Sequence, residues 1–124
     1  MRRLLFNRIT ERGERMKVKP GVDDSKLNKE IREALDLADK VHQILTGKEC
    51  VLTSTYDGVH RPRSGRQSRH YLNDAGDVRR WYLDAWNVTK GVTIFVALLS
   101  LILDKSLFQV CKESDHVHLE FDPK

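Results

Sequence analysis

Two short segments of this chain hold side chains suited to binding one metal ion. The first runs from Ser68 to Asp77 and the second from Asp115 to His118. Catalytic zinc sites typically use three protein ligands, drawn from histidine and carboxylate side chains, and leave a fourth position for water. His70, Asp77 and His118 would supply such a set. The residue types therefore predict a zinc site with these three ligands.

The spacing between the first two ligands constrains the chain between them. Seven residues of helix would separate His70 from Asp77 by roughly 10 Å along the axis, which is too far for two atoms that each lie about 2 Å from one zinc ion. Asn73-Asp74 and Gly76 favour turns and tolerate positive φ. We therefore expect a loop that returns the chain and delivers Asp77 from the start of a strand.

The same segments resemble the motifs of the D-Ala-D-Ala metallopeptidases, the LAS group of zinc peptidases. The first family motif, Ser-x-His-x-x-Gly-x-Ala-x-Asp, is in register at Ser68, His70, Ala75 and Asp77. Asn73 stands where this motif has glycine. The second family motif, Asp or Glu-x-x-His, is matched by Asp115 and His118. The resemblance implies a zinc-dependent peptidase that cleaves peptidoglycan stem peptides, as a D-Ala-D-Ala carboxypeptidase or an L-Ala-D-Glu endopeptidase, of phage or prophage endolysin type.

The resemblance also implies roles for the residues beside the third ligand. Asp115 would accept a proton from the attacking water and return it to the leaving amine, with Glu113 as the alternative carboxylate. His116 would hydrogen-bond the water or the tetrahedral intermediate, or orient Asp115. Glu120 either orients a ligand imidazole or is an exposed strand residue, and we favour the latter.

Substrate-binding residues are expected in the loop before the first ligand. Many family members carry an arginine after the preceding strand, but that position is Asp57 here. The positive charge that would bind a substrate carboxylate or stabilise the oxyanion is then expected from Arg61, Arg63, Arg66 or His60. Our substrate-binding candidates are Ser68, His60 and Arg61.

Length and composition predict one domain. The chain has 124 residues, 40% of them hydrophobic, which suits one core and is too little for two ordinary domains. Residues 1–15 hold five arginines and two glutamates, and so contribute most of the formal net charge of +4. We expect residues 1–15 to form a flexible basic extension and residues 16–124 to form the peptidase domain.

Hydrophobic periodicity predicts two helices. Apolar residues at three- and four-residue steps indicate an amphipathic helix over residues 27–45, with Asp24 or Ser25 as N-cap and Gly47 as its end. A nearly continuous apolar run over residues 92–103 is too short to span a membrane and predicts a buried helix that packs against a sheet. His42 flanks the first helix's apolar stripe and is interpreted as a half-buried or surface packing residue.

Strands are predicted at residues 49–55, 75–79, 107–112 and 116–121, the last two as a hairpin. In the final strand His116, His118 and Glu120 share one face, opposite Val117 and Leu119. Asp115 must then lie in the turn before regular pairing begins. The fold class is α+β, a small antiparallel sheet flanked by two main helices, and the resemblance implies the fold of hedgehog and DD-peptidase domains.

Other side chains are expected in structural roles. Cys50 and Cys111 lie in apolar segments and are interpreted as free thiols. Aromatic residues between two elements belong to the core more often than to a binding surface, and this favours the core for Trp81, Tyr82 and Trp86.

Two other functions are compatible with the pattern. One is a non-catalytic zinc domain of the same fold, which would have no use for Asp115. The other is a basic nucleic-acid-binding or nuclease domain, which leaves the Ser68–Asp77 register unexplained, so we do not expect a nucleic-acid partner. Residues 4–6 are too short an apolar run for a secretory signal, and we expect synthesis in the cytoplasm and action on the cell wall, without a membrane span.

Overall fold

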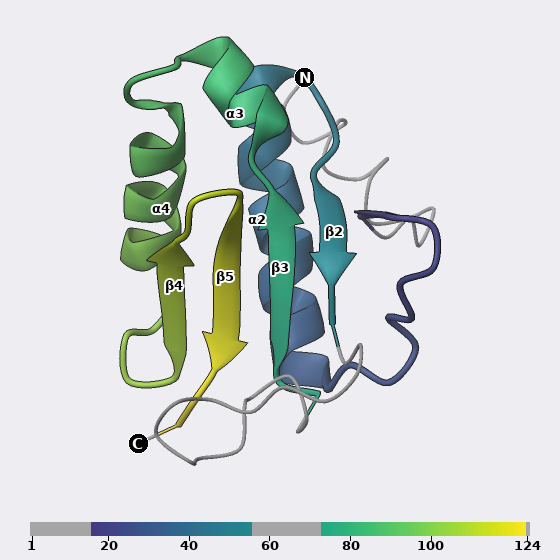
Figure 1. Cartoon of the computed structure of the whole chain (residues 1–124). Coiled ribbons are helices and arrows are strands. Elements are labelled where there is room, and N and C mark those ends of the chain that lie inside the picture. The colour runs from purple at the N-terminus through teal and green to yellow at the C-terminus, as the bar shows by residue number, and fades with distance from the viewer. Residues whose placement is uncertain (1–15, 56–72, 124) are drawn as a thin grey trace, which may run out of the picture.

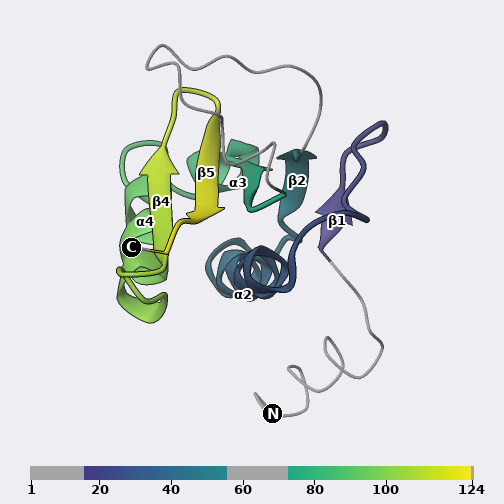
Figure 2. The same cartoon turned by 90° about the horizontal axis from the view of Figure 1, so that it is seen from below.

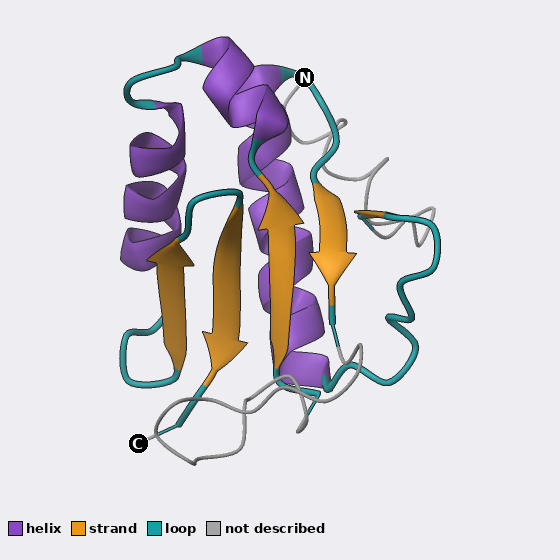
Figure 3. Cartoon of the chain, viewed as in Figure 1, coloured by secondary structure: helices purple, strands orange, loops and turns teal. Residues whose placement is uncertain are grey.

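The computed structural model of the chain describes residues 16–55 and 73–123. The predicted N-terminal extension and the loop before the first ligand lie outside these residues. So do four of the predicted site residues: His60, Arg61, Ser68 and His70. The described part is α+β, with a five-stranded sheet of order β1-β2-β3-β5-β4 (Figure 3). The elements are β1 (Lys17–Val18), α2 (Lys29–Thr46), β2 (Val51–Ser54), β3 (Ala75–Arg79), α3 (Trp81–Trp86), α4 (Gly91–Ile102), β4 (Phe108–Lys112) and β5 (His116–Phe121).

The sheet and the helices form two layers. α2 and α4 lie against the same face of the sheet, as two perpendicular views show (Figures 1 and 2). Three of the four strand pairings are antiparallel, and β1 pairs with β2 in parallel. The sheet is therefore mixed: the predicted antiparallel pairing holds for β2, β3, β5 and β4, and β1 adds one parallel pair. β1 has two residues, which is too short for alternation of polar and apolar residues to reveal it.

The first predicted helix is confirmed as α2, with a later start than expected. Its apolar stripe, including Ile31, Ala34 and Leu35, is buried in the core. The N-cap is Asn28 and not Asp24 or Ser25, because the chain before it is folded into a turn in which the Asp23 carboxylate accepts hydrogen bonds from Ser25. The helix ends at Gly47 as predicted, with φ of 74° and its N–H donating to the Gln43 carbonyl.

The second predicted helix is confirmed as α4, but only one of its sides is buried. Val92, Phe95 and Leu99 face the core, while Leu101 and Ile102 are 78% and 53% exposed. α4 lies at the β4 edge of the sheet, with one end beside the tip of that strand (Figure 1), so the sheet covers only part of its circumference. None of the described helices is both long enough and apolar enough to cross a membrane.

The three aromatic residues expected in the core lie elsewhere. They belong to α3, a short helix that the sequence patterns did not predict, and Trp81, Tyr82 and Trp86 are 63%, 40% and 43% exposed. Leu83 is the buried residue of α3. One buried side chain in six residues leaves no periodic pattern to detect.

Gly91 fixes the junction between α3 and α4. A Cβ atom at this position would lie 2.1 Å from the carbonyl oxygen of Leu83, so only glycine allows the two helices to approach this closely. Glycine in a helix lowers stability relative to alanine by up to about 1 kcal/mol. The close backbone contact reverses that preference here.

We expect Gly91→Ala to destabilise the fold by about 1–3 kcal/mol, because the added methyl group forces the two backbones apart. Urea unfolding followed by circular dichroism measures the change. Thr93→Ala, at an exposed position of the same helix, is the control and should stay within about 0.5 kcal/mol of the native protein. An alanine at position 91 that leaves stability unchanged or raises it would contradict this account of the junction.

Candidate functional site

The pairing of β3 with β5 brings the predicted site residues onto one face of the sheet. Asp77 lies directly opposite His118, and Arg79 lies opposite His116. Directly opposed residues point to the same face. Val117 and Leu119, which alternate with the histidines, are fully buried on the helix side. The predicted division of the last strand into two faces is confirmed. We call the other side the open face; it carries Asp77, Arg79, His116, His118 and Glu120.

His118 lies between two carboxylates. Its Nδ1 is 2.7 Å from Asp77 Oδ1, and its Nε2 is 2.9 Å from Glu120 Oε1. All three side chains are largely shielded from solvent, with exposed fractions of 13% to 17%. We call Asp77, His118 and Glu120 the His118 cluster. Glu120 is thus a partner of His118 and not the exposed strand residue we favoured, because side chains two apart on a strand project from the same face.

The two contacts bear on the protonation of His118. A carboxylate can only accept a hydrogen bond, so both ring nitrogens must carry a proton for both contacts to be hydrogen bonds. Burial is the strongest single influence and disfavours the charged ring, but the hydrogen bonds and charges of Asp77 and Glu120 together outweigh it and raise the pKa of His118 to about 9. In the absence of a metal ion, this raised pKa favours the doubly protonated His118 ring at neutral pH.

Asp115 lies in the turn of the β4–β5 hairpin, as the sequence required. The Glu113 N–H donates to the His116 carbonyl at 2.9 Å and closes this turn. Asp115 Oδ1 is 2.6 Å from His116 Nδ1, and His116 Nε2 is 3.6 Å from Asp77 Oδ1. The Asp115 side chain is 84% exposed. His116 thus links a solvent-exposed carboxylate to the His118 cluster.

The chain entering β3 turns at Asn73, which replaces the motif glycine. Asn73 has φ of 60°, in the left-handed region that asparagine tolerates better than most residues. Its carbonyl accepts the Asn28 N–H at 3.0 Å, and the Asn28 amide donates to the Asp74 carboxylate. The turn before Asp77 is confirmed at Asn73 and Asp74. Gly76 is not part of it.

Gly76 lies inside β3 and faces α2. A Cβ atom there would meet Leu35 Cδ1 at 2.9 Å and Leu52 Cδ1 at 3.0 Å. The strand that carries Asp77 therefore packs unusually close to the helix. The Asp77 carbonyl also accepts a hydrogen bond from the Thr53 hydroxyl at 3.2 Å, which ties Asp77 to β2.

The His118 cluster can contribute to a zinc site but does not complete one. In a tetrahedral site, two ligand atoms that each lie about 2 Å from zinc are about 3.3 Å apart. Asp77 Oδ1 and His118 Nδ1 are 2.7 Å apart, so a modest opening and the loss of the His118 proton would admit an ion. Glu120 on the other ring nitrogen matches the carboxylate partner common for metal-binding histidines. Within residues 16–55 and 73–123, no three His, Cys, Asp or Glu side chains form a metal-binding group.

The described part also holds His42, Cys50 and Cys111, of which Cys111 lies directly opposite His118 in the pairing of β4 with β5. His42 is buried, more completely than expected, and its Nδ1 is 2.7 Å from the Lys48 carbonyl. Burial lowers the pKa of His42. Cys50 and Cys111 are both free, and burial raises the pKa of each thiol. Neither cysteine has the lowered pKa of a reactive thiol.

Arg79 is a charged residue of the open face that the sequence analysis passed over. Its guanidinium lies 3.8 Å above the ring of Trp81, at a distance suited to a cation–π contact. The sequence did contain a signal, because Asp77 and Arg79 are two apart on a predicted strand and must share a face.

Comparison of the chain with protein-family models, with curated proteins and with solved structures finds no match in any of the three. A function for the open face must therefore be inferred from its own residues, their separations and their charges. These are two histidines, two shielded carboxylates and one arginine on adjacent strands, with the exposed carboxylate of Asp115 in the turn beside them.

The raised pKa of His118 predicts how stability depends on pH in the metal-free protein. The stabilisation is fully present below the ordinary histidine value of 6.5 and is lost as pH rises through about 9. Glu120→Gln should therefore destabilise the protein at pH 6 more than at pH 9.5, by about 1–2 kcal/mol. Urea unfolding in the presence of a chelator measures this difference.

Glu113→Gln, an exposed carboxylate in the same hairpin, is the control and should show no such difference. An NMR titration of the His118 ring reads the pKa directly. A native value at or below 6.5 would contradict the two-carboxylate arrangement.

Proposed function

We propose that this protein is a zinc-dependent peptidase of the D-Ala-D-Ala metallopeptidase type, with a fold of the hedgehog and DD-peptidase class. The observation that carries the proposal is the contact between Asp77 and His118, which are 41 residues apart in sequence and 2.7 Å apart in space. They are the expected ligands of two separate motifs. Coincident motifs would have no reason to place these two side chains together on one face of a sheet.

The proposed zinc ligands are Asp77, His118 and His70, the last of which lies outside the described residues. A zinc ion held there would supply an activated water near neutral pH and polarise the scissile carbonyl. Glu120 would keep the His118 ring in the orientation that directs Nδ1 towards Asp77. Because the same nitrogen binds either a proton or zinc, zinc affinity is expected to rise with pH.

Asp115 and His116 are proposed to handle the proton. The contact between Asp115 Oδ1 and His116 Nδ1 directs Nε2 towards the Asp77 side of the cluster. Asp115 would accept the proton of the attacking water and deliver it to the leaving amine, with His116 holding the water or the tetrahedral intermediate. The exposure of the Asp115 carboxylate supports catalysis over a purely structural zinc site, which has no need of an exposed base.

The proposed substrate is a peptidoglycan stem peptide, and the proposed setting is the cell wall, with an endolysin-like origin. The peptide ends released from peptidoglycan distinguish cleavage of the terminal D-Ala-D-Ala bond from cleavage of the L-Ala-D-Glu bond. Ser68, His60 and Arg61 remain candidates for substrate contacts and lie outside the described residues.

Zinc binding tests the ligand set. We expect about one zinc ion per chain by mass spectrometry of metals, with loss of binding in His118→Gln and Asp77→Asn. Glu120→Gln should weaken zinc binding by about 10–100-fold, because it orients a ligand without touching the ion. A native protein that binds no zinc would overturn the proposed ligands.

Digestion of purified peptidoglycan tests the activity. We expect new peptide ends by mass spectrometry, and a rate that falls by about 10²–10⁴-fold in Asp115→Asn because the general base is removed. Glu113→Gln is the matched control, two residues away in the same turn, and should keep nearly full activity. Zinc binding without any cleavage would favour a non-catalytic zinc domain, and loss of activity in Glu113→Gln alone would reassign the base.

A further inference from the structure

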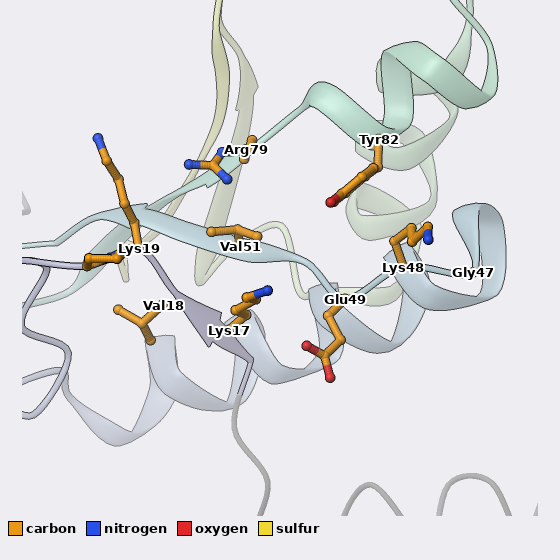
Figure 4. Close-up of a pocket in the computed structure, with 10 residues that line it drawn as sticks. Lys17, Val18, Lys19, Gly47, Lys48, Glu49, Val51, Arg79 and Tyr82 are labelled. Carbon is orange, nitrogen blue, oxygen red and sulfur yellow. The ribbon is translucent and has the colours of Figure 1, made fainter.

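A hollow of about 420 Å³ opens where β1, the start of β2, the end of α2 and α3 meet (Figure 4). Lys17 of β1 is paired with Val51 of β2, and both residues line the hollow together with Arg79 and Tyr82. Arg79 is also the cross-strand partner of His116. The hollow is thus next to the His118 cluster on the sheet but is built from other residues.

The lining is strongly basic. It includes four cationic side chains, those of Lys17, Lys19, Lys48 and Arg79, and one carboxylate, that of Glu49. Figure 4 shows the Glu49 carboxylate directed away from Arg79 and Tyr82. The ammonium and guanidinium groups are donors only, and the tyrosine hydroxyl can also donate. Such a surface is complementary to an oxyanion.

Two of these groups are held in place by neighbouring rings. The Arg79 guanidinium lies 3.8 Å above the Trp81 ring, and the planar fork of an arginine binds two oxygens of one anion. The Tyr82 ring packs edge-on against the buried His42, with ring centroids 6.2 Å apart. Tyr82 points into the space between Val51 and Lys48 (Figure 4). A guanidinium stacked on one ring and a tyrosine packed against another distinguish this hollow from a scatter of surface lysines.

We propose that this hollow binds the phosphate group of a small phosphorylated ligand. A phosphate monoester carries about −1.5 to −2 charges at neutral pH and offers three acceptor oxygens, which suits a lining with a net charge of three positives better than the single charge of a carboxylate does. Pockets of about 300–1,000 Å³ hold ligands larger than a bare phosphate. The remainder of the hollow therefore accommodates the organic part of the ligand.

Titration with inorganic phosphate and with glycerol phosphate, followed by ¹H–¹⁵N NMR of the chelator-treated full chain at low ionic strength, tests the proposal. Removing metal keeps this test separate from the zinc site. We expect shifts centred on Lys17, Val51, Arg79 and Tyr82, and tighter binding of glycerol phosphate than of phosphate. Malonate, a dianion without phosphate geometry, is expected to bind at least about threefold more weakly than phosphate.

Variants separate a built site from general charge attraction. Arg79→Lys keeps the charge but removes the fork, and Lys48→Gln removes one charge; each should raise the dissociation constant about fivefold or more. Tyr82→Phe should raise it by a smaller factor, and Glu49→Gln should lower it. Lys105→Gln, at an exposed position of the α4–β4 turn, changes net charge as Lys48→Gln does and should have no effect beyond about twofold.

Three results would overturn the proposal. The first is phosphate binding that Lys105→Gln weakens as much as Lys48→Gln does, which would indicate attraction to the net charge. The second is malonate binding as tight as phosphate binding, which would assign the hollow to carboxylates. The third is the absence of shifts at tens of millimolar phosphate in a native chain whose circular dichroism spectrum shows it to be folded.

Discussion

The antiparallel register between β3 and β5 is the constraint on which the core and the candidate site both depend. It places Val78 opposite Val117 on the helix side and Asp77 opposite His118 on the open face. Both valines are fully buried. A slip of one residue would move the charged pair into the core and the valines into solvent. The burial of apolar surface therefore holds the two site residues together, although their own contact is polar.

This arrangement also offsets the desolvation free energy of placing charged side chains near the core. A buried cation is unfavourable unless it is paired and hydrogen-bonded. His118 meets that condition with a carboxylate at each ring nitrogen, and the three groups together carry one negative charge. With a divalent ion in place of the proton, the ion and the three side chains together would carry no net charge. The cluster is thus electrostatically suited to exchange a proton for a metal ion.

The sequence predicted most of the elements that position the site and fewer of those around it. Alternation in residues 116–121 identified both faces of β5, and the boundaries of β3 were predicted to the residue, because polar and apolar side chains alternate along each strand. α3 and β1 were missed because they are too short to be periodic. The exposure of Leu101 was missed because hydrophobicity alone does not say how much of a helix a sheet covers.

Within the site, the residue types predicted the kind of chemistry better than they predicted the hydrogen-bond partners of each side chain. Asp77 and His118 were predicted to meet and do so, and Asp115 was placed correctly in its turn. Glu120 was interpreted as an exposed strand residue. Strand alternation shows which face of the sheet a side chain lies on, but not which polar neighbours it will hydrogen-bond. The placement of His70 stays a prediction, as do the roles of Ser68, His60 and Arg61.

The Asn28 contacts couple two parts of the molecule that are distant in sequence. The residue that begins α2 also binds the turn that leads into β3, through Asn73 and Asp74. The first turn of the helix and the approach to Asp77 must therefore order together. A fragment that began at β3 would retain every candidate ligand of the described part and still lack the anchor that places one of them, so the site belongs to the whole domain and not to a portable motif.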